Sequence, residues 1–500
     1  MLAIYNTLTN QKEKFKSLYK GKVNFYSCGP TVYDYAHIGN LRTYIFADTL
    51  KRVLEFDGYE VKHIMNITDV GHLTDDDIDQ GDSGDDKILK ALKKKQAENS
   101  EQKITPTDIA EFYTKAFQED IEKLNIEKAN FYPKATAHIP QMIKVIEGLI
   151  KKGYAYEKNG NVFYDVDKFT DYGRLSNKKL DELKHGARLE NHPDKKHSYD
   201  FALWLKAPKN HILKWSSPWG EGYPGWHIEC TAMSMEYLGE TLDLHTGGED
   251  NIFPHHENEI AQSEAYTGKP FSRYWAHPRH LLIDGKKMSK SKGNFYTLQN
   301  IIDKGYSPMA FRLLVLSAHY RSNLNFTWKA MDQATKNLET INNFINKIIT
   351  LEKETVIDNK EIKNDKDSAN MNIAIGDITP NHCLEKFSLA VNDDLNTPLA
   401  LSIVYRFITV VNKVNKLDQD QIKFILAFWK KVNKILGLKL DLPKNKKAEV
   451  IPEEISKLAN NREIARQEKN FDLADKIRDE IIAKGYILED TPTGIKIIKQ

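Results

Sequence analysis

Cysteine is scarce in this sequence, with only three residues among 500. Cys28, Cys230 and Cys383 lie far apart and form no closely spaced pair. Scattered thiols do not make a disulfide framework, and they are typical of a protein from a reducing compartment. A disulfide-stabilised secreted domain is therefore excluded, and Cys383 is interpreted as a filler residue on a helix.

Long apolar runs are also missing. No stretch approaches the roughly 20 residues that a membrane-spanning helix requires, and residues 1–11 lack the basic-then-apolar layout of a secretory signal. We expect a cytoplasmic, monomeric chain with no membrane partner. The formal net charge of +2 is nearly balanced, so a nucleic-acid partner would have to meet a local basic face.

A chain of 500 residues is too long for one hydrophobic core, and several domains are expected. Residues 23–27 form a buried strand pattern, a helix pattern runs from about 38 to 56 and ends before Gly58, and a second strand pattern covers 60–68. This β-α-β order predicts an α/β fold with a parallel sheet and a site at its strand ends.

The remaining chain divides by pattern into further predicted regions. Helices are expected at 107–124, 138–152, 226–237 and 255–266, with a hairpin around Asn159-Gly160 and a strand at 242–245. Residues 75–86 and 359–371 are polar loops, and 443–452 is a Lys-rich linker before two helices at 453–467 and 472–484 and a final hairpin. The predicted domains are 1–124, an insertion at 125–220, 221–308, a helical domain at 309–442, and 443–500.

The segment from Cys28 to Asn40 contains a first chemical patch. His37 and Asn40 lie where the first helix begins, and free N–H groups and the positive helix dipole attract phosphate there. Gly39 leaves room for an adenine or ribose to approach the backbone. A helix cap with a surface histidine explains the same tetrapeptide.

A second patch, Lys287-Met288-Ser289-Lys290-Ser291, lies in the C-terminal half of the chain. Two lysines on a glycine-containing loop can neutralise the charge that develops on a pyrophosphate group, and nucleotidyl transfer depends mostly on positioning and electrostatics. A Lys-rich surface loop is the alternative interpretation.

A third set of residues suits a metal ion. Cys28 ends the first strand, Cys230 lies in the 226–237 helix, and His255 and Glu259 are four residues apart, which places them on one helix face. Two thiolates, an imidazole and a carboxylate suit Zn²⁺. Spacing alone leaves open that the cysteines are buried apolar-like residues and His255 a core or cap histidine. A zinc peptidase is disfavoured, because the sequence around His255 is not H-E-x-x-H.

The histidine patch and, later in the chain, the lysine patch resemble the HIGH and KMSKS signatures of class I aminoacyl-tRNA synthetases, with Asn40 in place of the second histidine. Asn40 still donates hydrogen bonds but carries no charge. The metal set resembles that of the cysteinyl-tRNA synthetases position by position. The resemblance implies a Rossmann-like catalytic domain with an inserted connective domain, a helical bundle that faces the tRNA stem, and a small C-terminal α+β domain that binds the anticodon.

The same resemblance implies the chemistry. One Zn²⁺ per chain would take the thiolate of L-cysteine, and a soft thiolate gains more from zinc than a serine hydroxyl does, so no editing domain is expected. ATP with Mg²⁺ and tRNA(Cys) are the other partners. His37, Lys287 and Lys290 would be catalytic, and the implied ATP contacts are His37, Gly39, Asn40, Gly248, Asp250, Lys287 and Lys290.

Further positions follow from the family motifs. The amino-acid pocket would be lined by Gly29, Thr31, Thr68, Trp226 and His245, with His256 and Glu257 on the helix surface or supporting the ligands. The sequence Asp393-Asp394-Leu395-Asn396-Thr397-Pro398 matches a motif of the helical domain. The candidate anticodon readers are Arg466, Phe471, Asp475 and Asp490, although an amphipathic helical tail carries such residues anyway.

Two other functions remain open at this point. A ligase that joins cysteine to an amino-sugar, as in mycothiol synthesis, has a similar catalytic domain but would not need the tail after residue 450. A tRNA-binding relative without catalysis is favoured only by Asn40.

Overall fold

The computed structural model describes residues 1–70, 91–92, 96, 104–179, 192–208, 211–289, 293–357, 374–440, 452–468, 470–491 and 494–499. The predicted polar loops at 75–86 and 359–371 and nearly all of the Lys-rich linker lie outside these residues. The chain forms two compact units, Met1–Leu440 and Asp441–Gln500. Among the described helices, none is long and apolar enough to cross a membrane.

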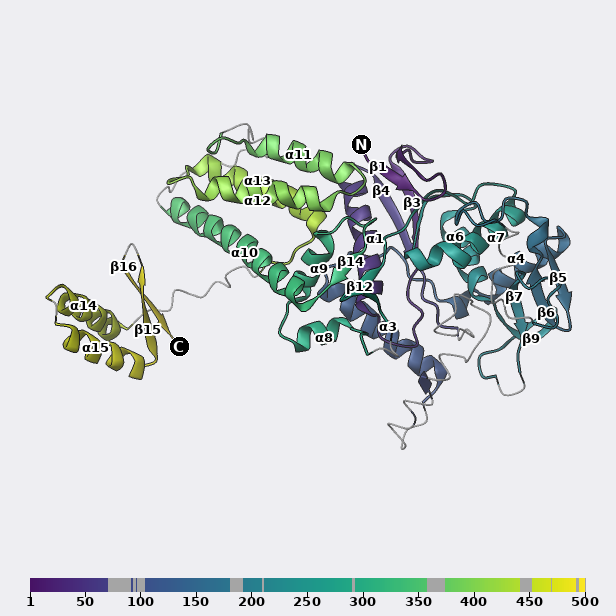
Figure 1. The fold of residues 1–500 in the computed structure, drawn as a ribbon, viewed down its shortest axis with the longest axis horizontal. Coiled ribbons are helices and arrows are strands. Elements are labelled where there is room, and N and C mark those ends of the chain that lie inside the picture. Colours follow the sequence, from purple (N-terminus) through teal and green to yellow (C-terminus); the bar gives the residue numbers. More distant parts are fainter. Residues whose placement is uncertain are drawn as a thin grey trace. The chain divides into compact units, whose positions relative to one another are not determined.

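A parallel four-stranded sheet organises the first unit (Figure 1). Its order is β11-β10-β3-β4, and every neighbouring pair is parallel. The strands are β3 (Lys22–Ser27), β4 (Glu60–Met65), β10 (Leu242–Thr246) and β11 (Ser272–Ala276). The helix α1 (Ile38–Phe56) connects β3 to β4. The predicted β-α-β unit and α/β class are confirmed, and the carboxyl ends of the strands meet along one edge.

An antiparallel sheet of five strands, in the order β5-β6-β7-β9-β8, interrupts the parallel sheet in sequence. Its strands are β5 (Ala155–Lys158), β6 (Asn161–Tyr164), β7 (Phe201–Lys206), β8 (Trp215–Ser217) and β9 (Gly220–Pro224). The predicted hairpin is present, with Asn159 and Gly160 at φ values of 56° and 87°, as its two-residue turn requires. The exact domain boundaries stay predictions.

Four further helices belong to this part of the chain: α3 (Pro106–Lys123), α4 (Ile139–Lys151), α6 (Trp226–Leu238) and α7 (Glu257–Thr267), with short 3₁₀ turns at Ala135–His138, Val166–Lys168 and Glu249–Asn251. The helix α6 packs on β3 and β4, and α4 packs on α6, α7 and β5. The helix predicted from His255 differs in its first turn. Ile252–His256 forms a separate π-type turn in which Phe253 is non-helical, because a residue before proline avoids the α conformation and Pro254 has no N–H to donate.

The rest of the first unit is mostly helical, as predicted. It contains α8 (Leu298–Asp303), α9 (Pro308–Leu316), α10 (Trp328–Ile357), α11 (Pro380–Asn392), α12 (Thr397–Asn412) and α13 (Gln419–Leu436). A small sheet, β13-β12-β14, joins Lys286–Lys287, Leu281–Ile283 and Leu324–Phe326. The N-terminal hairpin of β1 (Ala3–Asn6) and β2 (Gln11–Lys14) lies beside β11.

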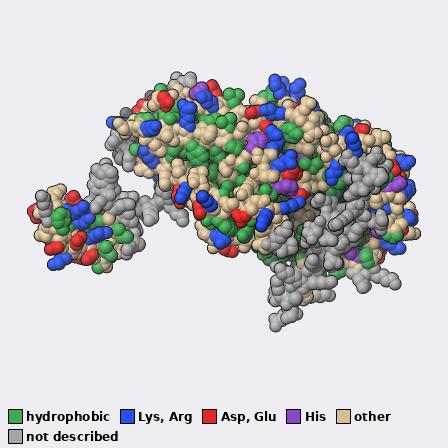
Figure 2. All heavy atoms as spheres, in the orientation of Figure 1, with side chains coloured by type: hydrophobic (Ala, Val, Ile, Leu, Met, Phe, Trp, Pro, Cys, Tyr) green, Lys and Arg blue, Asp and Glu red, His purple; other side chains and the backbone are tan. Residues whose placement is uncertain are grey.

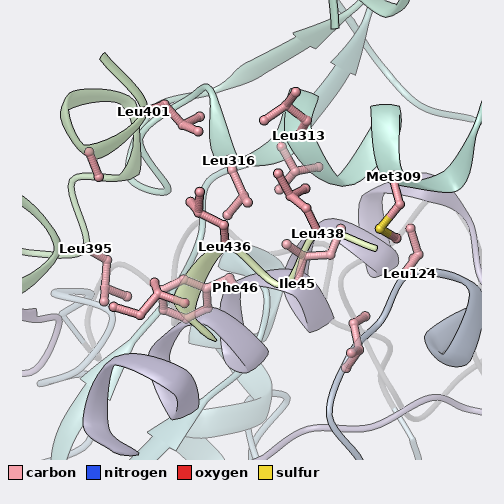
Figure 3. Close-up of a cluster of buried hydrophobic side chains, with 14 of the residues drawn as sticks. Ile45, Phe46, Leu124, Met309, Leu313, Leu316, Leu395, Leu401, Leu436 and Leu438 are labelled. Carbon is pink, nitrogen blue, oxygen red and sulfur yellow. The ribbon is translucent and has the colours of Figure 1, made fainter. Parts of the chain in front are cut away.

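One hydrophobic core joins α1 to the helical region. Figure 3 shows Ile45 and Phe46 of α1 facing leucines from α9, from the α11–α12 turn and from the end of α13. All of these side chains are buried. The helical region is thus packed directly on the helix that carries His37 and Asn40 at its start.

The second unit is a small α+β structure, as the sequence predicts. It contains α14 (Glu453–Gln467), α15 (Phe471–Ala483), β15 (Tyr486–Thr491) and β16 (Gly494–Lys499). Gly485 ends the second helix at a φ of 81°. Ile455, Ala459, Ile481 and Leu488 form its own buried cluster.

Candidate active site

The four proposed metal-binding residues come together at the carboxyl edge of the parallel sheet. Cys28 follows β3, Cys230 lies on α6, and His255 and Glu259 lie just before and within α7. Their ligand atoms all lie within 4.8 Å of one another, and His255 and Glu259 are almost completely shielded from solvent. The sequence prediction of one dispersed Cys-Cys-His-Glu group is therefore matched by a real cluster.

Two histidines hold the Glu259 carboxylate. The Nε2 atoms of His245 and His255 each lie 2.8 Å from one of its oxygens. Burial acts to raise the pKa of Glu259, but the charges and hydrogen bonds of these two histidines outweigh it and lower the pKa to about 2. Glu259 is thus held as an anion inside the protein before any ligand arrives.

In contrast to Glu259, both thiols have a raised pKa. Burial raises the pKa of Cys28, and the hydrogen bond with Cys28 together with burial raises the pKa of Cys230. Thiolates, not thiols, bind metals, so a cation that enters this cluster must displace protons. A divalent cation bound there would balance the negative charge of the two thiolates that form when these protons leave.

His256 belongs to the site more closely than predicted. Its Nε2 lies 3.1 Å from the Cys28 sulfur, and its Nδ1 lies 2.8 Å from Nε2 of His277. His256 and Glu257 are fully buried, so the surface interpretation was wrong and the supporting one fits. Cys28, His245, His256 and Glu259 form a second possible ligand group that shares two members with the first. The neighbouring His255-His256 pair was the sequence signal for this residue.

Two of the predicted amino-acid pocket residues, Trp226 and His245, contact residues of the cluster. The Trp226 ring lies 4.3 Å from the His255 ring, and Trp226 is half-buried. The Thr68 hydroxyl donates to a Glu229 oxygen at 2.8 Å, and Thr31 pairs with Thr68 through the backbone. Sequence reasoning missed Glu229, which is fully buried one residue before Cys230.

Gly29 is required by a close backbone approach. A Cβ atom at this position would lie 1.8 Å from the Asn66 carbonyl oxygen, and the Gly29 N–H donates to the Asn66 side chain at 2.8 Å. The side-chain NH₂ group of Asn66 donates to the Thr68 hydroxyl at 3.0 Å. Asn66 therefore fixes both proposed substrate-pocket segments, and the sequence analysis did not single it out.

The start of α1 forms a reciprocal cap. The Asn40 N–H donates to Nδ1 of His37 at 3.1 Å, and the His37 N–H donates to the Asn40 side-chain oxygen at 3.2 Å. The Ile38 N–H donates to the Tyr296 carbonyl. Several helix-start donors are thus used within the protein, so the side chains of His37 and Asn40, more than the bare backbone, would meet a phosphate.

Gly39 lets the His37 ring fold over this helix start. A Cβ atom on Gly39 would lie 2.9 Å from a carbon of the His37 ring and 3.8 Å from the methyl carbon of Met288. The second patch therefore lies against the first, although 248 residues separate Met288 from Asn40. Gly248 also borders α1, because a Cβ there would be 3.6 Å from the Thr43 hydroxyl.

The lysine patch is exposed and partly paired. The Lys287 amine lies 3.2 Å from an Asp250 oxygen, and both side chains are more than half exposed. His280 lies 3.5 Å from the other Asp250 oxygen. Lys290 lies outside the described residues, and the contact of the second patch with the first is made by Met288, next to Lys287.

The proposed anticodon readers lie in the second unit. Arg466 is near the end of α14, and Phe471 and Asp475 are in the first turns of α15, so the three share one end of the helix pair. All three are exposed, and Phe471 is 61% exposed, which is unusual for a phenylalanine. Asp490 lies in β15, and its side chain is outside the described structure.

Comparisons with known proteins identify the family of the chain. Residues 14–337 match the family model of the class I (C) tRNA synthetase catalytic domain, and residues 386–441 match the DALR domain. The chain is 45% identical to a cysteine–tRNA ligase of Treponema denticola and 44% identical to one of Thermococcus onnurineus. These matches cover 98% and 99% of this chain and 98% of each relative.

Solved structures share the fold at lower identity. A Mycobacterium tuberculosis methionyl-tRNA synthetase in complex with methionyl-adenylate superimposes with a TM-score of 0.56 over 83% of this chain and 90% of that one, at 13% identity. This likeness shows the class I synthetase fold alone. The full-length matches and the catalytic-domain model show that the chain belongs to the cysteinyl-tRNA synthetase family.

Proposed function

We propose that the chain activates L-cysteine with ATP and transfers it to the 3′-terminal adenosine of tRNA(Cys). The observation that carries this proposal is the buried Cys28-Cys230-His255-Glu259 cluster beside the start of α1. The cluster supplies a thiol-selective pocket, and α1 supplies the adjoining nucleotide site. Membership in the family supports both halves.

The donor set fits zinc. Two sulfurs, an imidazole nitrogen and a carboxylate oxygen within 4.8 Å of one another match the ligands and number that Zn²⁺ prefers. Bound there, the ion would supply a Lewis-acid centre for the substrate thiolate. His245 orients Glu259, and His227 lies 2.9 Å from the remaining nitrogen of His255, so both ligands have partners that fix their orientation.

The amino-acid pocket would orient the rest of the substrate. Trp226 forms an apolar wall against His255, and the Thr68–Glu229 pair presents polar atoms beside it. The cysteine carboxylate would then attack the ATP α-phosphate in line, with ATP bound as its magnesium complex. Positioning of the two substrates accounts for most of the acceleration, and no protein nucleophile is needed.

The first patch would stabilise the transferring phosphate. His37 uses Nδ1 as an acceptor for the helix cap, so a neutral ring carries its proton on Nε2 and can donate it. Asn40 accepts with its oxygen and keeps its NH₂ group as a donor. Asn40 can thus bind phosphate through a neutral hydrogen bond while it caps the helix.

The second patch would neutralise the pyrophosphate. Lys287 and Lys290 are the proposed cations, and Asp250 and Gly248 would border the adenosine. The ion pair of Lys287 with Asp250 is exposed and therefore weak, so a triphosphate could replace the carboxylate as the partner of Lys287.

The remaining parts of the chain would bind tRNA. The helical region would face the tRNA stem, and the second unit would bind the anticodon through Arg466, Phe471, Asp475 and Asp490. On the face drawn in Figure 2, basic and acidic side chains are interspersed, so recognition would depend on local groups. We also propose that the protein is a monomer and that it is cytoplasmic; the three cysteines, none of which forms a disulfide, support the second of these.

Two measurements test the proposal. Cysteine-dependent exchange of labelled pyrophosphate into ATP reports activation, and charging of purified tRNA(Cys) reports transfer. Exchange without charging would favour the amino-sugar ligase, and the loss of both would favour a non-catalytic tRNA-binding relative. Zinc measured at one ion per chain is the expected metal content.

A further inference from the structure

The turn between α11 and α12 has an unusual backbone. Asp394 and Leu395 follow one another at φ values of 59° and 53°, in the left-handed region that non-glycine residues rarely adopt. Both are buried. Consecutive conformations of this kind persist only where surrounding contacts hold them, and they often mark functional positions.

The Asp394 carboxylate joins three separate segments. One oxygen accepts from the Tyr5 N–H at 2.8 Å and from the Tyr320 hydroxyl at 2.5 Å, and the other accepts from Nε of Arg321 at 2.6 Å. The Arg321 guanidinium also lies over the Tyr5 ring at 4.6 Å. One buried anion thus ties β1, the connector formed by residues 319–322, and the α11–α12 turn.

The same connector is held from its other side by α1. The buried Arg42 guanidinium donates to the carbonyls of Tyr320 and Ser322 at 3.3 and 2.5 Å. It also donates to the carbonyls of Arg279 and His280 at 2.7 and 2.5 Å. Arg42 lies two residues after Asn40, so these bonds fix the nucleotide end of α1 without any contribution from Asp394.

The turn also packs against α1. Leu395 lies beside Phe46 in Figure 3, and Phe46, Tyr320 and Leu395 line one small cavity. Two joints therefore hold the connector. The inner joint, through Arg42, holds it to α1, and the outer joint, through Asp394, ties the α11–α12 turn to the connector and to β1.

We propose that Asp394 is a positioning residue for the tRNA-dependent step, which holds the helical region, and the tRNA bound to it, in register with the catalytic sheet. This inference rests on the proposed function. It predicts that the outer joint matters for aminoacyl transfer, whereas formation of cysteinyl-adenylate does not need it.

The test variant is Asp394→Asn in the full chain. Asparagine has the same shape and tolerates a left-handed backbone, but its NH₂ group would face the Nε–H of Arg321. We expect charging kcat/KM to fall about tenfold or more, while cysteine-dependent pyrophosphate exchange stays within about twofold of the unchanged chain. The ratio of charging to exchange is the readout that a general loss of folded protein would not change.

Matched controls sharpen the result. Asp393 lies in the same turn as Asp394 and forms an exposed ion pair with Lys12. Asp393→Asn removes this pair and should leave both activities unchanged. Arg321→Met should reproduce the loss, and the double variant with Asp394→Asn should lose no more than the larger single loss. Equal loss of exchange and charging, no loss, or the same loss in Asp393→Asn would each overturn the inference. Absence of exchange in the unchanged chain would instead refute the proposed function.

Discussion

The metal cluster and the lysine patch lie at the same edge of the sheet but are built in opposite ways. Glu259 is fully buried between two histidines, whereas Asp250 and Lys287 are paired in the open, with 58% and 65% of their side chains exposed. Buried charges are held by fixed partners, and exposed pairs contribute little and are screened by salt. Under the proposed function, the amino-acid pocket is thus held in place in advance, whereas the charges that meet the pyrophosphate would be ordered by the substrate.

The largest expected effect comes from breaking the cluster. Cys230→Ser replaces a soft sulfur ligand by a hydroxyl, so zinc content should fall and discrimination of cysteine over serine should drop by about a thousandfold. Metal analysis and exchange with both amino acids measure this. Cys383→Ser is the matched control, because Cys383 lies on α11 outside the cluster, and it should keep both zinc and selectivity.

Removing a cation from the exposed side should have a smaller effect. Lys287→Ala should lower the kcat of pyrophosphate exchange about a hundredfold with unchanged zinc content, because one stabilising charge at the transition state is lost. The neighbouring exposed Lys286 provides the control as Lys286→Ala. If both variants lost the same activity, a specific role for Lys287 would be contradicted.

His37 stands between the two regions, since it caps a helix and would also touch phosphate. His37→Asn keeps a good N-cap residue but loses the outer ring nitrogen, so exchange should fall roughly tenfold to a hundredfold while the melting temperature changes by no more than about 2 °C. His37→Ala should lose the cap as well and unfold more easily. Thermal melts beside exchange assays separate the two roles, and unchanged exchange in His37→Asn would refute the phosphate contact.

The smallest expected effect concerns a buried carboxylate that the site does not use. Burial on α3 raises the pKa of Asp120 to about 6, in contrast to Glu259. The folded state therefore binds the proton more tightly than the unfolded chain, and the cost to stability grows as pH rises from about 4 to above 6. Asp120→Asn should stabilise the protein by about 1–2 kcal/mol at pH 8 and by little at pH 4. Denaturant unfolding at both pH values measures this, and equal gains would contradict the pKa assignment.

Elements with strong local signals were predicted well. The helix 38–56 was predicted with its observed bounds, because a start near His37 and a stop at Gly58 are encoded within a few residues. The Asn159-Gly160 hairpin follows from turn chemistry alone. The helix at His255 was misjudged in its first turn, where Pro254 overrides the helical pattern.

Some features of the candidate site were likewise predictable from the sequence, and others depended on the packing of the chain. Sequence and family resemblance supplied Cys28, Cys230, His255 and Glu259, which the fold brings together. The burial of His256 and Glu257 and the partners of Thr68 depend on how α6 and α7 pack on the sheet. No pattern within one helix distinguishes a polar face that meets solvent from one that meets other buried polar groups.

The sequence by itself determined the order of strands and helices, the helix caps and turns, and the residue types available to bind metal and nucleotide. Only the tertiary structure decided which of them meet. The Asp394 carboxylate and the Tyr5 amide are 389 residues apart in sequence and 2.8 Å apart in space. Local propensities act over a few residues, whereas such contacts form only when the whole chain packs around its shared cores.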